Sequence, residues 1–375
     1  FVSTNSICQG QQVPILWGAL LGAGLSINFA YRSFKWSNLA SNKAGVTVVI
    51  VGFSQKSIPR KTLYLNEQGA SEVTAKSVSN INGYLVGGPN VSVEPKRRPA
   101  LQLSHMQFGN HPYYGGDLIM SQSESKELTS SNSEVARFLR PFYGSKEIID
   151  QTPRACLWIT DDVVEIAMQI PAVAERIESV RKSRLAAVKD KTAQQLAKTP
   201  HKFREQVIAK RWCFGIPRVS SENRPYLPVS LLDSAAIVQE KAFAMYDAPL
   251  WNMALIASRL HWVWIGTVCV RMRTDFSYSN TLGWNTFPVP KLTEKNKEDL
   301  TRCAENILLA REAHFPATIA DLYNPETMPE NLQQAHEEND ETLERIYIGR
   351  RFKNDTERLE KLFDIYTKMT GATAA

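Results

Sequence analysis

Positive charge is concentrated in one segment of this 375-residue chain. Residues 172–211 contain eleven Lys and Arg side chains against four acidic ones, an excess of seven, while the whole chain has a net charge of +6. Charge on a helix is usually only a solvated face, but so lopsided a segment is typical of a surface that faces phosphates. We therefore expect it to bind nucleic acid. Its candidate phosphate contacts are Arg176, Arg181, Lys182, Arg184, Lys189, Lys191 and Lys198.

The segment RMRTDFSYS, residues 271–279, alternates polar and aromatic side chains. If it is extended, Arg271, Arg273 and Asp275 point the same way, and Ser277 continues the alternation. Such a combination suits contact with bases and phosphates better than small-molecule chemistry. The alternative is a surface hairpin without a special role.

The other reactive residue types form no recognisable catalytic or metal-binding pattern. The six histidines lie far apart, and the five cysteines are never at CxxC spacing. Glycine-rich phosphate loops, HExxH and Gly-x-Ser-x-Gly are all missing from the sequence. We therefore expect no metal site and no complete active site. The scattered cysteines favour a reducing cytoplasm, and the apolar run over 13–25 is too short to cross a bilayer.

The elements that position these residues begin with an α/β segment. A helix is predicted over Gln9–Leu21, and strands over Ser26–Phe29 and Val46–Phe53. The near-continuous apolar run VTVVIVGF is typical of a strand covered on both faces. Strand, helix and strands in this order resemble the end of a doubly wound, Rossmann-like sheet. A free-standing unit of about 53 residues would be marginally stable, so we expect the chain to open inside a larger domain.

The rest of the chain has the length and composition for further folded domains. A linker is one interpretation of the front half of residues 54–150, which are rich in Ser, Asn and Gly. Beyond it we expect a mixed α+β region with a buried helix over Trp251–Val270. A helical region follows, with helices starting at Thr293 and capped by Asp355.

Several stretches closely resemble one family. Three stretches resemble the last third of the catalytic domain of adenine-N6 DNA methyltransferases, most closely that of the large single-chain MmeI-like enzymes. These stretches are FVSTNSICQGQQVPILW, INFAYRSFKWSN and AGVTVVIVGF. The resemblance continues through FGNHPYYGGDLIMS, RMRTDFSYSNTLGWNTFPVP and ADLYNPETMPENLQQAHE, so it covers nearly the whole chain. It implies the end of a catalytic domain over 1–54, a target-recognition domain over 55–290 and a helical domain over 291–375.

The resemblance also implies which groups are missing from these residues. The family's glycine-rich S-adenosylmethionine loop and its Asn-Pro-Pro-Tyr tetrad are not in the sequence. We therefore expect the chain by itself neither to bind that cofactor nor to methylate. Its expected partners are double-stranded DNA and the upstream methyltransferase domain of the same chain, without a membrane.

Two sites carry over from the family. The loop RSFKW implies that Phe34, or alternatively Trp36, stacks on the extruded target base. In the second site, Arg273 and Asp275 occupy positions that contact bases, followed by Ser277. A guanidinium suits guanine O6/N7 and a carboxylate suits the cytosine amino group.

Both sites have structural alternatives, and a further loop is a weaker candidate. Phe34 could simply pack under the sheet edge, and Arg273 with Asp275 could form a surface ion pair of little energetic consequence. Glu222 and Arg224 in the loop PRVSSENR are further candidates for base contact. The rival to a methyltransferase is a stand-alone DNA-binding specificity protein that serves a separate methylase. The segments VTVVIVGF and RSFKW argue against it, since such a subunit would not need them.

Overall fold

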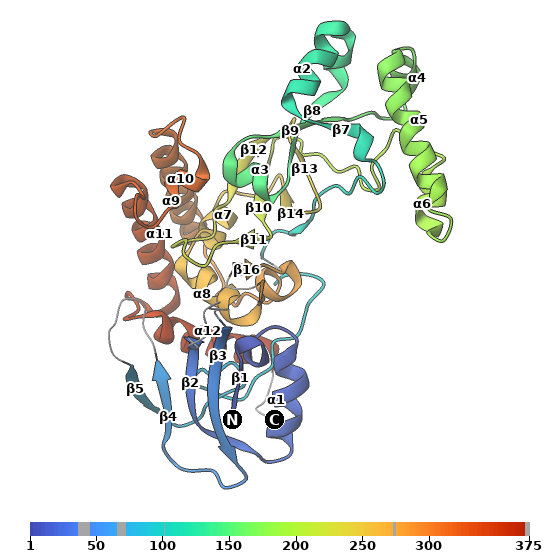
Figure 1. The fold of residues 1–375 in the computed structure, drawn as a ribbon. Helices are drawn as coiled ribbons and strands as arrows, with labels where there is room; N and C mark the ends of the chain where they lie inside the picture. The colour runs from blue at the N-terminus through green and yellow to red at the C-terminus, as the bar shows by residue number, and fades with distance from the viewer. Residues whose placement is uncertain (37–45, 66–72, 101, 273–274, 372–375) are drawn as a thin grey trace.

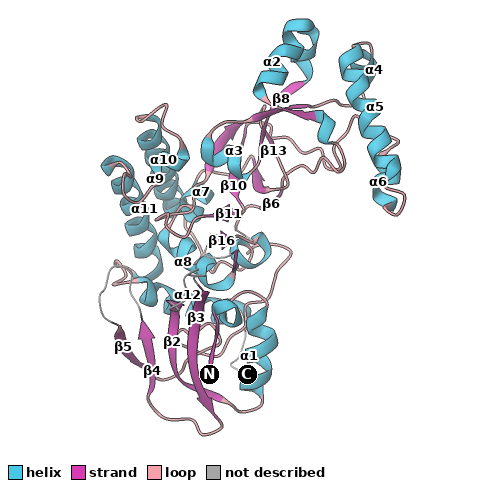
Figure 2. Cartoon of the chain, in the orientation of Figure 1, coloured by secondary structure: helices cyan, strands magenta, loops and turns pink. Residues whose placement is uncertain are grey.

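The computed structural model describes residues 1–36, 46–65, 73–100, 102–272 and 275–371. Figure 1 shows three regions: a first sheet, a mixed α/β region that extends away from it, and helices along one side of both. The same view coloured by secondary structure separates the helical side from the sheets (Figure 2). The expected fold class, α/β followed by α+β and a helical region, is confirmed.

The first sheet has five strands in the order β1–β3–β2–β4–β5. Its strands are β1 (Val2–Thr4), β2 (Ser26–Trp36), β3 (Val46–Ser54), β4 (Lys61–Leu65) and β5 (Thr74–Val78). β2 is parallel to β4, and the other neighbours are antiparallel. Helix α1 (Gln12–Gly22) packs on this sheet through Trp17, whose ring lies 6.1 Å from that of Phe53. The sheet therefore runs beyond residue 54, where we expected this part to end, because β4 and β5 extend its edge.

The linker interpretation of the following residues is wrong. Ile81, Tyr84, Leu85 and Val93 are buried in the main core, which a linker would not provide. Tyr84 also packs against Phe363 of the last helix, with ring centroids 5.1 Å apart. This stretch therefore joins the first sheet to the C-terminal helices.

The middle region contains three small sheets. The first, in the order β12–β10–β14–β6, consists of Ser230–Asp233, Trp212–Pro217, Ala242–Tyr246 and Gln107–Phe108. The second, in the order β13–β8–β9–β7, consists of Ile237–Val238, Leu139–Tyr143, Arg154–Leu157 and Ile119–Met120. The third, in the order β11–β16–β15, consists of Val219–Ser220, Asp275–Ser277 and Val270–Met272.

Helices of the middle region lie at both of its ends. α2 (Gln122–Ser131), α3 (Ser145–Asp150), α4 (Val164–Met168), α5 (Pro171–Ala186) and α6 (Lys191–Leu196) come first. Of these, α2 and α4 to α6 lie at the end farthest from the first sheet (Figure 1). The helix expected over 251–270 is two helices, α7 (Trp251–Ile256) and α8 (Arg259–Val268). The break arises because the Ser258 side chain accepts a hydrogen bond from the His261 amide and starts a new helix.

The C-terminal region is helical, as predicted. It contains α9 (Glu294–Glu312), α10 (Ile319–Leu322), α11 (Glu330–Ile348) and α12 (Asp355–Thr370). Thr293 caps α9 in a capping box with Asn296, so the predicted start is confirmed. The predicted cap of the last helix is wrong, because Asn354 accepts the hydrogen bond of the Glu357 amide. The carboxylate of Asp355 is used elsewhere, as described below.

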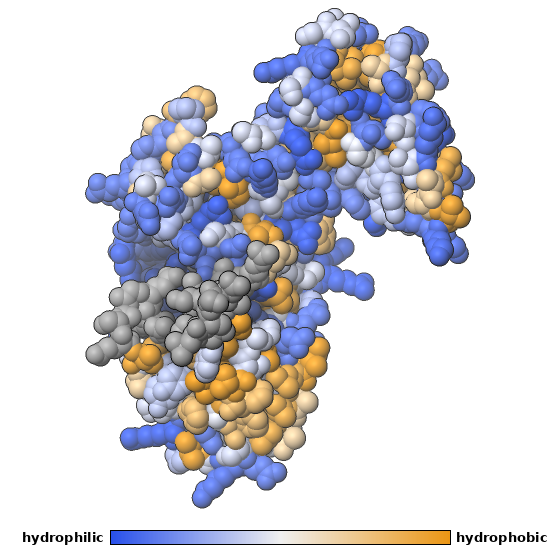
Figure 3. Space-filling model, viewed as in Figure 1, coloured by the Kyte–Doolittle hydropathy of each residue, from blue (hydrophilic) through white to orange (hydrophobic). Residues whose placement is uncertain are grey.

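One hydrophobic core runs through all three regions. It joins Trp17 and Val49 of the first part to Trp264 of α8 and Phe363 of α12, whose rings lie 5.2 Å apart. A second core lies between β7–β9 and α5. Figure 3 shows apolar side chains gathered over the first sheet and α1. The exposed apolar residues of these elements include Val2 of β1 and Ile15 of α1. Among the described residues, no helix is long and apolar enough to cross a membrane.

Candidate functional site

A cleft of about 980 Å³ lies where the three regions meet. The first sheet contributes Arg32, the middle region contributes Arg224 and Arg271, and the C-terminal helices contribute Asp355 and Arg358. Among the described residues, no group of His, Cys, Asp and Glu is arranged to hold a metal ion. The cleft therefore presents charged donors and acceptors suited to binding a large polar ligand.

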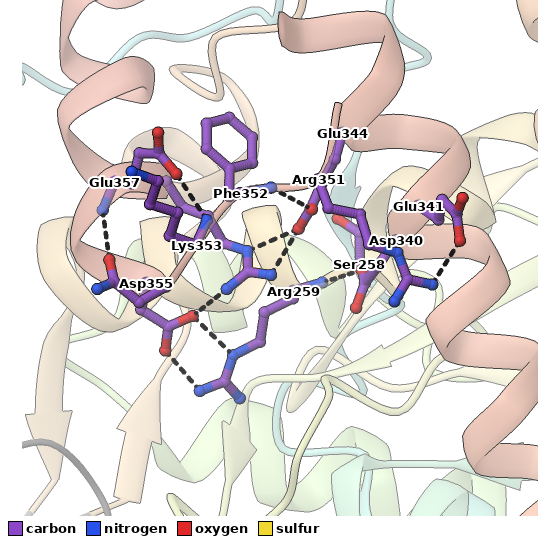
Figure 4. Close-up of polar contacts among 12 residues, drawn as sticks. Ser258, Arg259, Asp340, Glu341, Glu344, Arg351, Phe352, Lys353, Asp355 and Glu357 are labelled. Atoms are coloured by element: carbon purple, nitrogen blue, oxygen red, sulfur yellow. Dashed lines mark hydrogen bonds and ion pairs between the residues drawn. The ribbon is translucent and has the colours of Figure 1, made fainter. Parts of the chain in front are cut away.

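An ion-pair network ties one wall of the cleft together (Figure 4). Arg259 at the start of α8 contacts both oxygens of Asp355, with Nε–Oδ1 of 3.1 Å and Nη2–Oδ2 of 2.6 Å. Arg358 donates to the same Asp355 at 2.9 Å and to Glu344 of α11 at 2.7 Å. Since these residues come from α8, α11 and α12, the network joins the middle region to the C-terminal helices.

Asp340 lies beside this network and is half-buried. Burial raises the pKa of its carboxyl to about 7, against hydrogen bonds from the Arg259 amide (2.7 Å) and the Tyr226 hydroxyl (2.9 Å). Sequence reasoning gave no role to Asp340, Arg259 or Glu344. Their partners are distant along the chain, so no local motif indicates them.

The strands β15 and β16 form an antiparallel hairpin at the cleft, which we call the recognition hairpin. Arg271 pairs with Phe276, and Met272 with Asp275. Directly opposed side chains share a face, so Arg271 lies on the face of Phe276 and not with Asp275. The expectation that Arg271 points the same way as Asp275 is therefore wrong, because two paired strands replace one extended segment. Arg273 lies outside the described residues.

Aromatic packing holds the recognition hairpin on α8. The Phe276 ring is buried, with its centroid 4.2 Å from that of Trp262, and the Arg271 guanidinium lies 4.2 Å from the same ring. Gly266 of α8 makes this approach possible, since a Cβ there would lie 2.6 Å from Phe276 Cε1. Asp275 and Ser277, two residues apart in β16, are left on the opposite face from Phe276.

The loop after β11 contributes the other two predicted base-contact residues. Glu222 accepts from Arg271 Nη1 at 2.9 Å, and Arg224 donates to Ser220 Oγ at 3.3 Å. Burial lowers the pKa of the Arg224 guanidinium, an effect that the carboxylate of Asp275 opposes. The structure therefore places Glu222 against Arg271 and brings Arg224 within electrostatic reach of Asp275.

The predicted stacking aromatics lie at the end of β2. Their ring centroids are 6.2 Å apart; Phe34 is half-buried, and 47% of the Trp36 surface is exposed. Pairing with β3 shifts register between Tyr31 and Phe34, which places an extra residue in β2. At this irregularity Arg32 faces the cleft, and it has no hydrogen bond or ion pair among the described residues. Burial lowers the pKa of the Arg32 guanidinium, and the Asp355 carboxylate opposes this shift.

The basic segment over α5 and α6 is only partly available for ligands. Arg184 is fully buried, and its guanidinium donates to five backbone carbonyls: Pro112, Tyr113, Leu196, Thr199 and Lys202. The prediction that Arg184 contacts a phosphate is therefore wrong, because its guanidinium is already occupied inside the protein. Arg176 pairs with Glu124, and Arg181 bonds Glu178 and the Ala197 carbonyl. The exposed cations of the predicted set are Lys182, Lys189, Lys191 and Lys198.

Comparisons with known proteins cover all three regions. Residues 1–65 match the MmeI DNA-methyltransferase domain family, 87–291 the MmeI target recognition domain and 292–373 the MmeI C-terminal domain. The chain is 40% identical over 371 residues to DNA methyltransferase A of Bacillus subtilis (strain 168), covering 99% of this chain and 41% of that protein. It also matches the solved structure of the type IIL restriction-modification enzyme MmeI in complex with DNA. That match has a TM-score of 0.85 and 34% identity, and it covers 99% of this chain and 49% of the MmeI chain.

Proposed function

Because this chain belongs to the MmeI family of DNA methyltransferases, we propose that it is the part of a site-specific adenine-N6 methyltransferase that recognises the target sequence. The chain spans less than half the length of the two relatives described above. Methyl transfer to double-stranded DNA within a restriction–modification system is thus the activity proposed for the complete protein. The observation that carries the proposal is the single cleft shared by β2 and the recognition hairpin.

The geometry supports a division of roles among the end of β2, the hairpin with its neighbouring loop, and the helices α5 and α6. Phe34 stacks on the extruded adenine, with Trp36 as the alternative, since a flat base needs a flat apolar partner. Asp275, Ser277 and the neighbouring loop contact base edges, and the predicted contact from Arg273 belongs to the same proposal. The exposed lysines of α5 and α6 contact phosphates farther along the duplex.

S-adenosylmethionine is the methyl donor that the family implies. Residues 1–375 contain no glycine-rich loop suited to this cofactor, so no residue of the cleft is assigned to it. The side chains described above act on DNA instead. All five cysteines are buried and unpaired, which supports a reducing cytoplasm as the place of action.

The rival function is a stand-alone specificity protein that serves a separate methylase. The packing favours the enzyme, because the first sheet shares one core with α8 and α12. A free specificity subunit gains nothing from the pair of aromatic side chains at the end of β2.

The test maps methylated sites genome-wide for the complete protein, before and after exchange of Arg273 and Asp275. We expect the exchange to change the preferred base pair at one position of the site. Changing one such contact costs about 1–3 kcal/mol of discrimination there and leaves the other positions unaltered. The matched control exchanges Asp299 and Arg302, a 2.8 Å ion pair on the exposed side of α9, and should leave the motif unchanged. An unchanged motif with uniformly lower methylation after the first exchange would refute base contact by the hairpin.

A further inference from the structure

A second groove, about 620 Å³ in volume, lies on the other face of the recognition hairpin. Met272 and Ser277 form part of its wall, whereas Arg271 and Phe276 line the cleft. The hairpin therefore separates the two spaces. The opposite wall comes from the start of α3 and the turn after β13.

Hydrogen bonds hold this second groove in a defined shape. Ser145 Oγ donates to the Lys241 carbonyl and accepts from the Arg218 amide at 2.9 Å. Arg154 contacts Glu147 at 2.8 Å and donates to Gln239 at 3.0 Å. These bonds link four segments that are distant in the sequence. The groove is therefore built by the fold and does not depend on a single loop.

Two side chains packed against Gly144 reinforce the same wall. A Cβ at Gly144 would lie 2.7 Å from both Gln239 Oε1 and Glu147 Oε2. Only glycine fits here without displacing these side chains, because such contacts are far shorter than van der Waals distance. The close packing of the Gln239 and Glu147 side chains against Gly144 therefore helps to shape the groove.

The charge of the groove is positive and mostly unpaired. Lys146 and Lys241 are exposed on its rim, and neither has an ion pair among the described residues. Among the described residues that line the groove, Glu147 supplies the one carboxylate, and it is paired with Arg154. An anion entering here meets cations without displacing an acid.

Arg218, which is half-buried, also lines this positive groove and is held in place by its neighbours. Its guanidinium lies 4.9 Å from the Phe108 ring and 5.6 Å from that of Phe243, and Nη1 donates to the Glu240 carbonyl at 3.1 Å. Nε is buried without an acceptor among the described residues. A buried donor without a partner calls for an explanation such as an ion, and a planar guanidinium matches the oxygens of a phosphate.

We propose that this groove binds backbone phosphates of the DNA duplex whose bases the recognition hairpin contacts. The proposal rests on the function proposed above. Lys146 and Lys241 act as point charges on the phosphates, and Arg218 donates from a fixed plane. Ser277 lines the groove and lies in the same strand as Asp275. A DNA backbone bound in the groove would therefore fix where the base edges lie relative to the hairpin.

The test measures duplex binding by the 375-residue chain as a function of salt, using a random-sequence DNA duplex. Changing Lys146→Ala and Lys241→Ala together should lower the slope of log affinity against log salt by about 1.8, at roughly 0.9 per phosphate. Affinity should fall about 60-fold at 0.1 M salt and approach the wild-type value near 1 M. The matched control is Lys56→Ala with Lys126→Ala, exposed lysines that line neither space. Unchanged thermal unfolding of both variants shows that the fold is intact.

The outcomes separate this proposal from the proposed function. A wild-type chain without salt-dependent duplex binding would overturn both. Wild-type binding with an unchanged slope in the Lys146 and Lys241 variant would overturn the groove alone, as would an equal loss in the control. Tighter binding of an RNA duplex than of the DNA duplex would also overturn it. Arg218→Gln should weaken duplex binding too, and the two lysine changes should then have a smaller effect because one site is shared.

Discussion

Replacing Gly266 by alanine should impair base discrimination without removing DNA binding. The added Cβ would lie 2.6 Å from Phe276 Cε1, and ordinary contact begins at 3.4 Å, so the ring must move by roughly 1 Å. Trp262 and Arg271 pack on the same ring and restrict its escape. The recognition hairpin should therefore move away from α8 and carry Asp275 with it.

The magnitude follows from two opposing effects on stability and one on binding. Overpacking costs about 1–3 kcal/mol, while alanine in a helix stabilises by about 1 kcal/mol relative to glycine. We therefore expect a net loss of about 0–2 kcal/mol in the free energy of unfolding. A displaced base contact should lose about 1–3 kcal/mol of discrimination, roughly 5- to 150-fold.

The assay compares affinity for a duplex with the methylated motif and for one with a single base pair changed. The matched control is Gly18→Ala in α1, where an added Cβ meets no atom within 4 Å. That variant should gain stability and keep wild-type discrimination. Phe276→Leu in the Gly266→Ala background should restore part of the discrimination by making room. If Gly266→Ala discriminates between the duplexes as the wild type does, the hairpin is not held through Phe276 and the reasoning fails.

Three further predictions concern the buried polar groups and the stacking aromatic. Burial raises the pKa of Asp340 to about 7, so the folded protein retains a proton that the unfolded chain releases near pH 4. The free energy of unfolding should therefore fall as pH rises from 4 to 7, and in urea unfolding Asp340→Asn should show a flatter pH dependence than the wild type. Arg184→Leu should cost about 3–5 kcal/mol in chemical denaturation, because it leaves buried carbonyls without donors, and a loss below 1 kcal/mol would contradict its structural role. Phe34→Ala in the complete protein should slow methylation while specific binding persists; equal 2-aminopurine fluorescence at the target position in wild type and variant would count against stacking by Phe34.

Local patterns predicted much of the fold. The apolar run VTVVIVGF is strand β3, and the Thr293–Asn296 spacing starts α9, because each signal lies within a few residues. Features that depend on distant partners were not predictable in this way. Arg184 has the same type and spacing as a solvated helix cation, yet carbonyls from two other segments surround it. Asp355 has the sequence of a helix cap, but Arg259, 96 residues away, binds its carboxylate.

The candidate site shows the same division. The resemblance indicated Phe34 and Asp275, which the structure places at the end of β2 and on the hairpin. Glu222 and Arg224, the weaker candidates from the loop PRVSSENR, line the cleft. Alternation alone placed Arg271 on the wrong face, since no Asn-Gly or Asp-Gly turn signals a hairpin within RMRTDFS. The role of Lys146 and Lys241 also depends on the fold, because 95 positions separate two side chains on one groove.

The hairpin packs on α8, and this packing affects how target specificity can diverge among relatives. Its support, α8, is itself anchored by Asp355 and Asp340 from the C-terminal helices and packs against Phe363. A middle region exchanged between relatives at its sequence borders would lose these contacts with the C-terminal helices. Exchange of the whole region therefore changes both the hairpin and the packing that supports it. The side chains on the face opposite Phe276, such as Asp275 and Ser277, do not pack on α8 as Phe276 does. If the hairpin contacts bases as proposed, new target sequences arise most readily through single replacements of these side chains. Such replacements can accumulate one at a time in a protein that stays folded.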